Sequence, residues 1–248
     1  MATPPMNSAP GSFYYHNWPI LYLDNHLFVL YKPAGLLVQG DRSQDITLLE
    51  LGRGWLKEHY GKPGKVFLGL VHRLDRPVAG VVLFARTSKA AARISEQFRT
   101  GNVSKRYLAI VEGRLSAATG RLINHLERHE RVSRIIQESV PGSQEARLSY
   151  RVLDQIASQC LVEIDLETGR RHQIRLQLAH LGHPIVGDVR YGAAQPLPNG
   201  QIALLARELC FDHPTSHQLV TVASPLPIGW PWPGGVADPH APPWRWTD

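Results

Sequence analysis

Residues 66–85, VFLGLVHRLDRPVAGVVLFA, place a charged segment between two apolar runs. The second run, Gly80–Ala85, is short and apolar and follows a proline, which is typical of a buried strand. Asp75 lies between Arg73 and Arg76, and opposite charges nearby favour the ionised form of a carboxyl group. An ionised, partly desolvated carboxylate can act as a nucleophile or a general base. The plainer interpretation is a turn closed by an Asp–Arg pair.

The segments on either side of this stretch predict an α+β fold with a mixed sheet. Apolar runs and alternating patterns indicate strands, and capping signals before periodic apolar residues indicate helices. Strands outnumber helices and include adjacent, hairpin-like pairs, which favours this class. Residues 114–146 are less regular. The expected strands are 27–31, 80–85, 105–112, 148–153, 160–166, 203–211 and 218–223, and the expected helices run from the capping box Thr47–Glu50 to before Gly61, from a Ser88 cap through Phe98, and over 171–181.

A second charged cluster, TGRRHQIR at residues 168–175, occupies a predicted strand-to-helix turn. Backbone N–H groups at a helix start, together with three arginines, can bind a phosphate or a carboxylate. Arg171 and Arg175 are four residues apart, so they share one face if both are helical. The alternative is a solvated basic helix end, although three arginines in an N-terminal turn oppose the macrodipole and are not explained by stability alone.

Five further residues have both a functional and a structural interpretation. Lys32 could reach a phosphate or could be a solvated lysine at a strand end. Tyr107 follows two basic residues on a predicted strand, where it could stack on a nucleobase or belong to the sheet. His72 is interpreted as a hydrogen-bonded structural histidine. His180 and His183 have a loose spacing with no third ligand nearby in the sequence, so we expect no metal site.

The composition is that of a globular protein with a basic surplus. The 248 residues include 27 Lys and Arg against 21 Asp and Glu, which gives a net charge of +6 and a pI near 9.5. Such a pI is expected of nucleic-acid-binding proteins, although it is weak evidence alone. Cys160 and Cys210 have no close cysteine partner, which favours a reducing compartment. No signal peptide and no run near the ~20 apolar residues of a membrane span is recognisable, so we expect a cytoplasmic protein without membrane contact.

Taken together, these segments resemble the RluA-type family of RNA pseudouridine synthases. The resemblance extends over roughly residues 20–228 and rests on three motifs and one strand. The second and third motifs, in this order, are highly specific. The matching segments are VLYKPAG (29–35), HRLD (72–75) with Gly80 following, TGRRHQIR (168–175) running into GHPIVGD (182–188), and the tyrosine strand KRYLAIVEG (105–113).

The resemblance implies an all-protein active site on a mixed, largely antiparallel sheet flanked by helices and loops. It implies isomerisation of a uridine of tRNA or rRNA to pseudouridine, with no cofactor and no metal. Asp75 matches the catalytic aspartate, Tyr107 the tyrosine that stacks on the target base, and Arg175 the basic residue that pairs with the aspartate. Arg73 matches the arginine of a base-flipping wedge. The other expected RNA contacts are Lys32, Arg76, Arg170 and Arg171.

These roles suit the chemistry of the side chains. A uridine must leave its stack before its glycosidic bond can be reached, at a cost of a few kcal/mol, and an inserted arginine offsets part of that cost. Breaking the C–N bond builds oxocarbenium character, which a carboxylate can stabilise or capture. Asp75 could form an adduct at C1′ or C6, or remove a proton from the sugar. Either Tyr107 or a water could take the C5 proton.

The sequence also departs from the family pattern. The aspartate motif usually continues with Thr-Ser-Gly, whereas Val78-Ala79-Gly80 stands here, and Gln177 replaces a frequent histidine. We expect a modest change in the rigidity of the Asp75 loop. Many relatives carry an N-terminal S4-type RNA-binding domain, for which the residues before Leu21 are too few, so we expect RNA contacts from the catalytic domain, with the basic segment 121–134 as a candidate.

The expected organisation is a flexible N-terminal arm (1–18), a catalytic domain (19–228) and a Pro/Trp-rich C-terminal tail (229–248), in a monomer. Two other functions remain open. A non-catalytic RNA-binding or RNA-folding factor could use the same scaffold, although RNA binding alone needs no carboxylate near phosphates. A nucleoside or glycoside hydrolase usually needs two carboxylates, and the matched motifs offer no second acid for that role.

Overall fold

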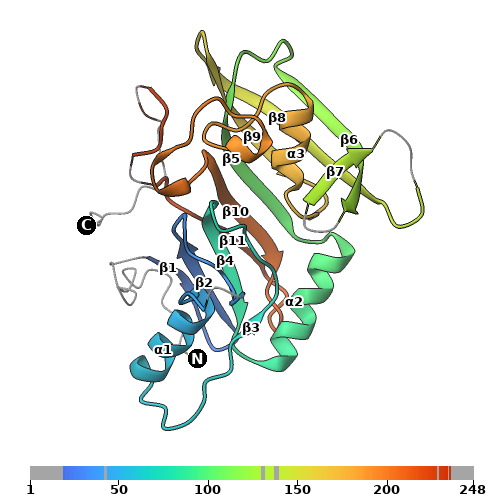
Figure 1. The fold of residues 1–248 in the computed structure, drawn as a ribbon. Coiled ribbons are helices and arrows are strands. Elements are labelled where there is room, and N and C mark those ends of the chain that lie inside the picture. Colours follow the sequence, from blue (N-terminus) through green and yellow to red (C-terminus); the bar gives the residue numbers. More distant parts are fainter. Residues whose placement is uncertain are drawn as a thin grey trace.

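The computed structural model describes residues 19–41, 44–129, 132–136, 140–227, 229–233 and 235. The arm predicted for residues 1–18 lies outside the described residues, as do residues 236–248 of the predicted tail. The described strands form one mixed sheet with helices packed against it, and the sheet continues from one half of the molecule into the other (Figure 1). This confirms the predicted α+β class.

The sheet is largely antiparallel. Its strands pair in the order β1-β2-β4-β10-β5-β9-β8-β6-β7, with β11 on β10 and β3 on β4, and the β4–β10 pair is parallel. The strands are β1 Ile20–Leu23, β2 Leu27–Lys32, β3 Gly69–Leu70, β4 Ala79–Ala85, β5 Ser104–Glu112, β6 Thr119–His129, β7 Val132–Ile136, β8 Gln144–Gln155, β9 Gln159–Leu166, β10 Leu204–Asp212 and β11 Leu219–Ala223. The helices are α1 Leu48–His59, α2 Ser88–Thr100 and α3 Gln173–His180, with 3-10 turns at Val189–Tyr191 and Pro198–Gly200.

Strands β2 and β4 are buried on both faces, which explains why they read as continuous apolar runs. One face packs Phe28 and Phe84 against Leu51 of α1, and the other packs Val29 and Leu83 in one cluster with Ile94 of α2. Helix α1 begins at the predicted capping box of Thr47 and Glu50. The two helices therefore hold β2 and β4 from opposite faces, and β4 is the strand that follows the Asp75 loop.

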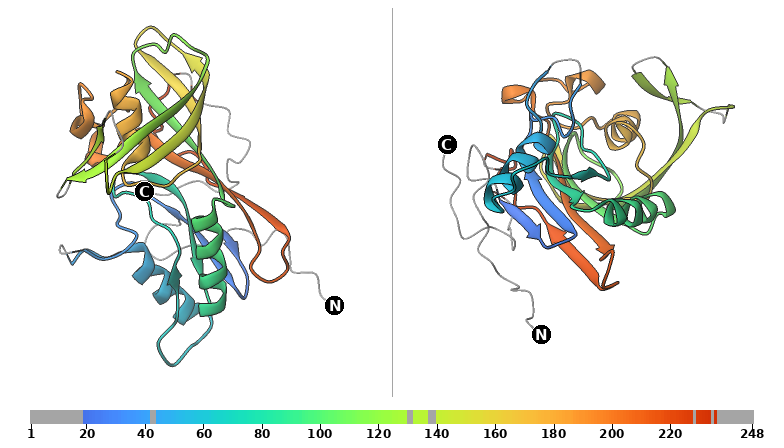
Figure 2. Two further views of the ribbon diagram at one scale, coloured as in Figure 1. Left: turned by 90° about the vertical axis from the view of Figure 1, so that its right-hand side faces the viewer. Right: turned by 90° about the horizontal axis from the view of Figure 1, so that it is seen from below.

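The other half of the molecule is built on β5, β9, β8 and β6, with α3 packed against it (Figure 2). Its core joins strand residues such as Val111 and Ile164 to Leu178 of α3. Trp232 is buried in the same cluster, and Trp230 packs on its edge. The described part of the predicted tail, residues 229–233 and 235, thus includes side chains that pack on the domain.

One register position ties the two halves together. Ala206 of β10 is paired with Gly80 of β4 on one side and with Tyr107 of β5 on the other. Gly80 has φ +128°, and a Cβ there would overlap the backbone of Ala206. Only glycine fits this close approach. Gly80 therefore fixes the loop before β4 relative to the strand that carries Tyr107.

Three sequence predictions need correction. The cap of α2 is Thr87, one residue before the predicted Ser88, and its hydroxyl accepts the N–H of Ala90. The irregular segment 114–146 contains β6, β7 and the start of β8. These strands do not follow a strict apolar–polar alternation, because exposed Arg–Glu pairs such as Arg121–Glu167 line part of them. The third helix begins at Gln173 rather than at Arg171.

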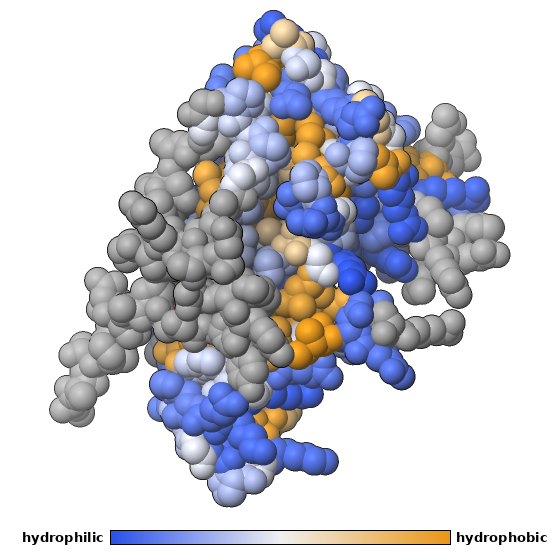
Figure 3. All heavy atoms as spheres, turned by 60° about the vertical axis from the view of Figure 1, so that its left-hand side comes forward, coloured by the Kyte–Doolittle hydropathy of each residue, from blue (hydrophilic) through white to orange (hydrophobic). Residues whose placement is uncertain are grey.

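The surface is mixed in character. On the face shown in Figure 3, hydrophilic side chains predominate at both ends and apolar ones gather toward the middle. Within the described part of the chain, no helix is long and apolar enough to cross a membrane.

Candidate active site

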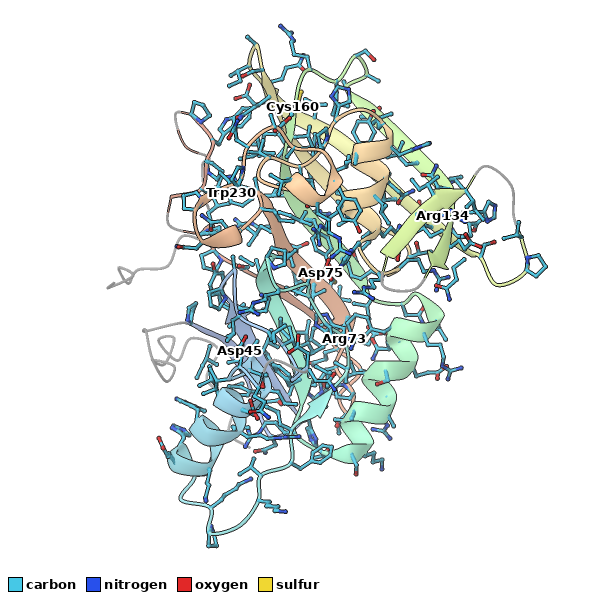
Figure 4. The ribbon with its side chains drawn as sticks, in the orientation of Figure 1. Asp45, Arg73, Asp75, Arg134, Cys160 and Trp230 are labelled. Carbon is cyan, nitrogen blue, oxygen red and sulfur yellow. The ribbon has the colours of Figure 1, made fainter. Side chains whose placement is uncertain are left out.

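Asp75 lies in the loop between β3 and β4, near the junction of the two halves (Figure 4). Its side chain is 31% exposed. Oδ2 lies 3.3 Å from Nη1 of Arg175 and 3.5 Å from Nε2 of His172. No described residue donates a hydrogen bond to Oδ1. The carboxyl group is thus held through one oxygen while the other stays available to a ligand.

Arg175 is itself fixed by a second carboxylate. Its Nε and Nη2 donate to the two oxygens of Asp188 at 2.6 and 2.8 Å, and both side chains are buried. The hydrogen bonds and charges of Asp188 and then Asp75 raise the pKa of Arg175 against the lowering effect of burial. A bidentate pair also fixes the plane of the guanidinium. Arg175 therefore remains charged and keeps Nη1 directed at Asp75.

Sequence reasoning assigned Asp188, the last residue of the GHPIVGD segment, no functional role and missed this partner. The need for a carboxylate follows from the burial of Arg175, which becomes apparent only in the fold. Since both oxygens of Asp188 are occupied by Arg175 and its side chain is buried, Asp188 does not supply the free second acid that a glycosidase needs.

His172 contacts Asp75 from a strained backbone position. It caps α3 with φ +56°, in the left-handed region that residues other than glycine seldom adopt, histidine more often than most. Its Nδ1 lies 2.6 Å from the Tyr191 hydroxyl. Burial, together with the charges of nearby arginines, lowers the pKa of His172 to about 4, against the opposite effect of Asp75. His172 is therefore neutral at pH 7. A residue other than glycine held in the left-handed region is strained, and strained residues often lie at functional sites.

This cap also corrects the prediction for Arg171. Because the helix begins after His172, Arg171 precedes it and does not share a helix face with Arg175. Arg171 is exposed, whereas Arg175 is buried. The basic cluster is thus divided between the surface and the interior.

Tyr107 lies on β5, partly buried, and packs against the core under α3. Burial raises its pKa, and the charge of Asp75 raises it further. Tyr107 therefore lies within electrostatic range of Asp75. The phenol keeps its proton at neutral pH, and its ring is the candidate aromatic surface for a base bound near Asp75.

Lys32 requires a correction, because it is fully buried rather than near a phosphate. Its ammonium donates to the carbonyls of Pro33, Leu36 and Arg76 at 2.9, 2.7 and 3.1 Å. Burial lowers its pKa to about 7. All three donors are used, so Lys32 ties the loop after β2 to the residue that follows Asp75.

The exposed arginines near Asp75 fall into two groups. Arg76 donates to the Gly35 carbonyl at 2.9 Å and pairs with Asp45 at 3.0 Å, and Arg170 donates to the Glu145 carbonyl at 3.0 Å. Arg73 and Arg171 have no hydrogen-bond or ion-pair partner among the described residues. Their guanidinium groups are therefore free for a ligand. The expected RNA-contact roles of these four residues stay predictions.

The basic segment 121–134 is less available. Arg121 pairs with Glu167 at 2.8 Å and Arg134 with Glu127 at 2.8 Å, while the side chains of residues 128–131 lie outside the described part. Neutralised arginines attract phosphates weakly. We therefore place more weight on the arginines around Asp75.

The residues that depart from the family motif, Val78, Ala79 and Gln177, all pack within the fold. Val78 and Ala79 are buried in apolar clusters. The loop is held instead by main-chain bonds, including the Val78 N–H to the Asp75 carbonyl at 3.1 Å. Gln177 is buried and donates to Asn124 Oδ1 at 2.7 Å, which links α3 to β6. Neither hydroxyls nor a histidine are needed for these contacts.

The histidines in the matched motifs also have clear roles. His72 accepts the Leu83 N–H at 2.9 Å and stacks on Phe98, which confirms its structural interpretation. Burial, together with the charge of Lys105, lowers its pKa to about 3. His183 Nδ1 lies 2.9 Å from the Glu112 carbonyl. The described residues contain no group of three metal-ligating side chains.

Comparison with known proteins places this geometry in context. A family model described as RNA pseudouridylate synthase matches residues 26–180. Ribosomal large subunit pseudouridine synthase D of Xylella fastidiosa is 37% identical over 223 residues, which cover 84% of this chain and 66% of that protein. The uncharacterized RNA pseudouridine synthase YhcT of Bacillus subtilis is 35% identical, with 86% and 70% covered. The chain thus spans about two thirds of the length of these relatives.

Two solved structures have a similar fold. Human RNA pseudouridylate synthase domain containing 4 superposes with a TM-score of 0.72 at 26% identity and covers 85% of this chain and 89% of that chain. The domain containing 1 protein gives 0.66 at 25% identity, with 85% and 84% covered. These likenesses confirm the predicted fold. Because the family model matches more than half of the sequence and the motifs around Asp75 lie within it, the chain belongs to the RNA pseudouridylate synthase family.

Proposed function

We propose that this protein isomerises a uridine within RNA to pseudouridine, with Asp75 as the catalytic carboxylate. The observation that carries the proposal is the environment of Asp75. Arg175 holds one of its oxygens, the other accepts no hydrogen bond from the described residues, and Tyr107 lies within electrostatic range of the carboxylate. A carboxylate held in this way can meet the developing positive charge of a sugar without changing its own position.

The reaction is an isomerisation and needs no second substrate. The C1′–N1 bond breaks, the uracil turns while it stays bound, and a C1′–C5 bond forms. The C5 proton is then lost and N1 regains a proton. Because the base must not escape, a bound aromatic platform is required, and we assign this role to Tyr107.

The raised pKa of Tyr107 bears on the proton transfer. A phenol whose pKa lies above its usual value is a weak source of phenolate at pH 7. We therefore favour a bound water, rather than Tyr107, as the group that takes the C5 proton. Tyr107 then contributes its ring and a neutral hydroxyl.

Arg73 is our candidate for the side chain that replaces the flipped base. It is exposed, lies two residues from Asp75 and has no partner among the described residues. Arg171 and Arg170 approach the same region from the turn before α3. Because the Xylella fastidiosa relative is named for the large ribosomal subunit, rRNA is the first substrate to test, with tRNA beside it.

The test is tritium release from unmodified rRNA and tRNA transcripts that carry uridine labelled at C5. We compare the wild type with Asp75→Asn, and use Asp154→Asn as a matched control. Asp154 is exposed and bonds only locally, to the Gln155 N–H. Release by the wild type and the control, but not by Asp75→Asn, supports the proposal.

The same experiment separates the alternatives. RNA binding without release by the wild type would favour a non-catalytic RNA-binding factor. Free uracil as the product would favour a hydrolase. We also propose that the protein acts as a monomer in the cytoplasm. Light scattering of the free protein tests the first point.

A further inference from the structure

Lys105 is a second buried lysine, and it lacks the partners that such a residue normally has. It is 9% exposed. Among the described residues it has no carboxylate partner and no hydrogen-bond acceptor. Trp230 Nε1 is the only fully buried side-chain polar atom of the described residues without a partner, so the Lys105 ammonium retains contact with solvent. The ammonium is thus partly desolvated and has no partner among the described residues, which is costly and calls for an explanation beyond stability.

Lys32 shows what a structural buried lysine looks like in this protein. Its three donors meet three carbonyl oxygens. Lys105 has none of these contacts among the described residues. Burial lowers its pKa, and the charge of Arg170 lowers it further. Lys105 in turn helps to lower the pKa of His72, so Lys105 lies within electrostatic range of both Arg170 and His72.

The two faces of β5 differ in whether their basic side chain has acidic partners. Arg106 lies between carboxylates, with Asp165 at 3.3 Å, Glu208 at 3.2 Å and Glu163 at 3.8 Å. Lys105 is the preceding residue and therefore points to the opposite face. That face also carries Tyr107, two residues or about 7 Å along the strand. The unpaired cation thus lies on the side of the candidate active site.

We propose that Lys105 and Arg170 together bind a backbone phosphate of the RNA strand next to the uridine that stacks on Tyr107. The inference rests on the proposed function and adds a subsite to it. A phosphate supplies the acceptor oxygens that Lys105 lacks and neutralises the charge shared with Arg170. Arg170 can take part because only its Nε is used, on the Glu145 carbonyl.

The test compares Lys105→Met and Lys105→Arg with the wild type, using a single-stranded uridine-containing RNA oligonucleotide at several salt concentrations. Lys105→Met should weaken the Kd about tenfold, the loss expected for one charged hydrogen bond. The slope of log K against log salt should fall by about 0.7, which corresponds to one phosphate contact. Lys105→Arg keeps the charge and should retain most of the slope.

Arg114→Gln is the matched control, because Arg114 is exposed, has no described partner, and follows the far end of β5. It removes one positive charge away from Tyr107 and should leave the slope unchanged. Thermal unfolding is the second readout. If Lys105 serves a ligand, Lys105→Met should unfold at the same or a higher temperature than the wild type, because an unpaired buried charge is removed.

Each outcome is decisive. A lower Tm for Lys105→Met with an unchanged salt slope would assign Lys105 to the fold and overturn the inference. Normal RNA affinity and slope in Lys105→Met, with active wild type, would overturn the subsite but leave the proposed function intact. A wild type that neither binds RNA nor releases tritium would overturn both.

Discussion

Two aspartates of the described residues, Asp24 and Asp75, each contact a histidine, and their surroundings are opposite. Oδ1 of Asp24 accepts the N–H groups of His26 and Leu27, both at 2.7 Å. Its Oδ2 lies 2.7 Å from His213 Nε2 and accepts the Tyr22 hydroxyl at 3.1 Å. Asp75 has only the looser contacts of Arg175 and His172, both on one oxygen. Asp24 is saturated with short hydrogen bonds, and Asp75 is not.

The difference shows how the same residue types serve structure or chemistry. Asp24 joins the β1–β2 turn to the loop after β10, where the backbone N–H of Ser216 donates to His213 Nδ1 at 3.1 Å. Every lone pair directed inward is used, so this cluster stabilises the fold. Asp75 keeps an oxygen available and is oriented by residues that are themselves held by others. Unused hydrogen-bonding capacity next to a rigid support is what a reacting carboxylate requires.

The largest effect is expected for Asp75→Asn. Turnover should fall by at least about 1,000-fold, because the neutral amide cannot stabilise or capture positive charge on the sugar. Unfolding free energy should change by less than about 1 kcal/mol, since Arg175 keeps its bidentate partner Asp188. Tritium release and urea unfolding measure the two quantities. A variant that keeps wild-type turnover would place the chemistry elsewhere.

Asp188→Asn should affect both properties. It leaves the buried guanidinium of Arg175 with one looser carboxylate, which costs about 3–5 kcal/mol of unfolding free energy for a broken buried pair. Arg175 also loses its orientation, so kcat should fall while Asp75 is still present. Urea unfolding and single-turnover assays give the result. A stable variant with normal kcat would show that Arg175 needs no second carboxylate.

The elements with local causes could be predicted from the sequence. The capping box of Thr47 and Glu50 and the run at Gly80–Ala85 correspond to α1 and β4 within a residue or two. The strands β6 and β7 could not, because residues such as Arg121 are held by pairing across strands with Glu167, far along the chain. In β6 and β7, tertiary contacts outweigh the intrinsic strand propensity of the residues.

The site divides in the same way. The resemblance brought Asp75, Tyr107 and Arg175 to attention. The structure joins Arg175 to Asp75 and leaves Tyr107 within electrostatic range of that carboxylate. The burial of Lys32 and the bond between Arg175 and Asp188 depend on the tertiary fold, which no local pattern reveals. A lysine before a proline and an aspartate after a glycine look like surface residues until the fold is known.

Asp24→Asn should destabilise the fold without reducing kcat. Loss of the charge weakens several hydrogen bonds, which costs about 1–3 kcal/mol. Bonds from His26, Leu27 and His213 lower the pKa of Asp24 against the effect of burial. A lowered carboxyl pKa gives stability that is present above the unfolded value of about 4 and is lost as pH falls further.

Urea unfolding from pH 7 to pH 2 therefore tests the Asp24 cluster. The wild type should lose its advantage over Asp24→Asn as the pH falls below about 4. The difference should be constant between pH 5 and pH 7. An equal difference at pH 2 would mean that the charge of Asp24 is not the source of its contribution.

The smallest effect on stability is expected for His172→Gly. The left-handed backbone at residue 172 costs a non-glycine residue about 1–2 kcal/mol, which glycine avoids. That gain offsets the loss of the Tyr191 contact, so unfolding free energy should stay within about 1 kcal/mol of the wild type. The variant also removes one of the two side chains that contact Asp75, so kcat should fall about tenfold. His172→Asn, which tolerates the same backbone but has a shorter side chain, should behave alike. If both variants were clearly destabilised and kept normal kcat, His172 would have a structural role, like that of His213 in the Asp24 cluster.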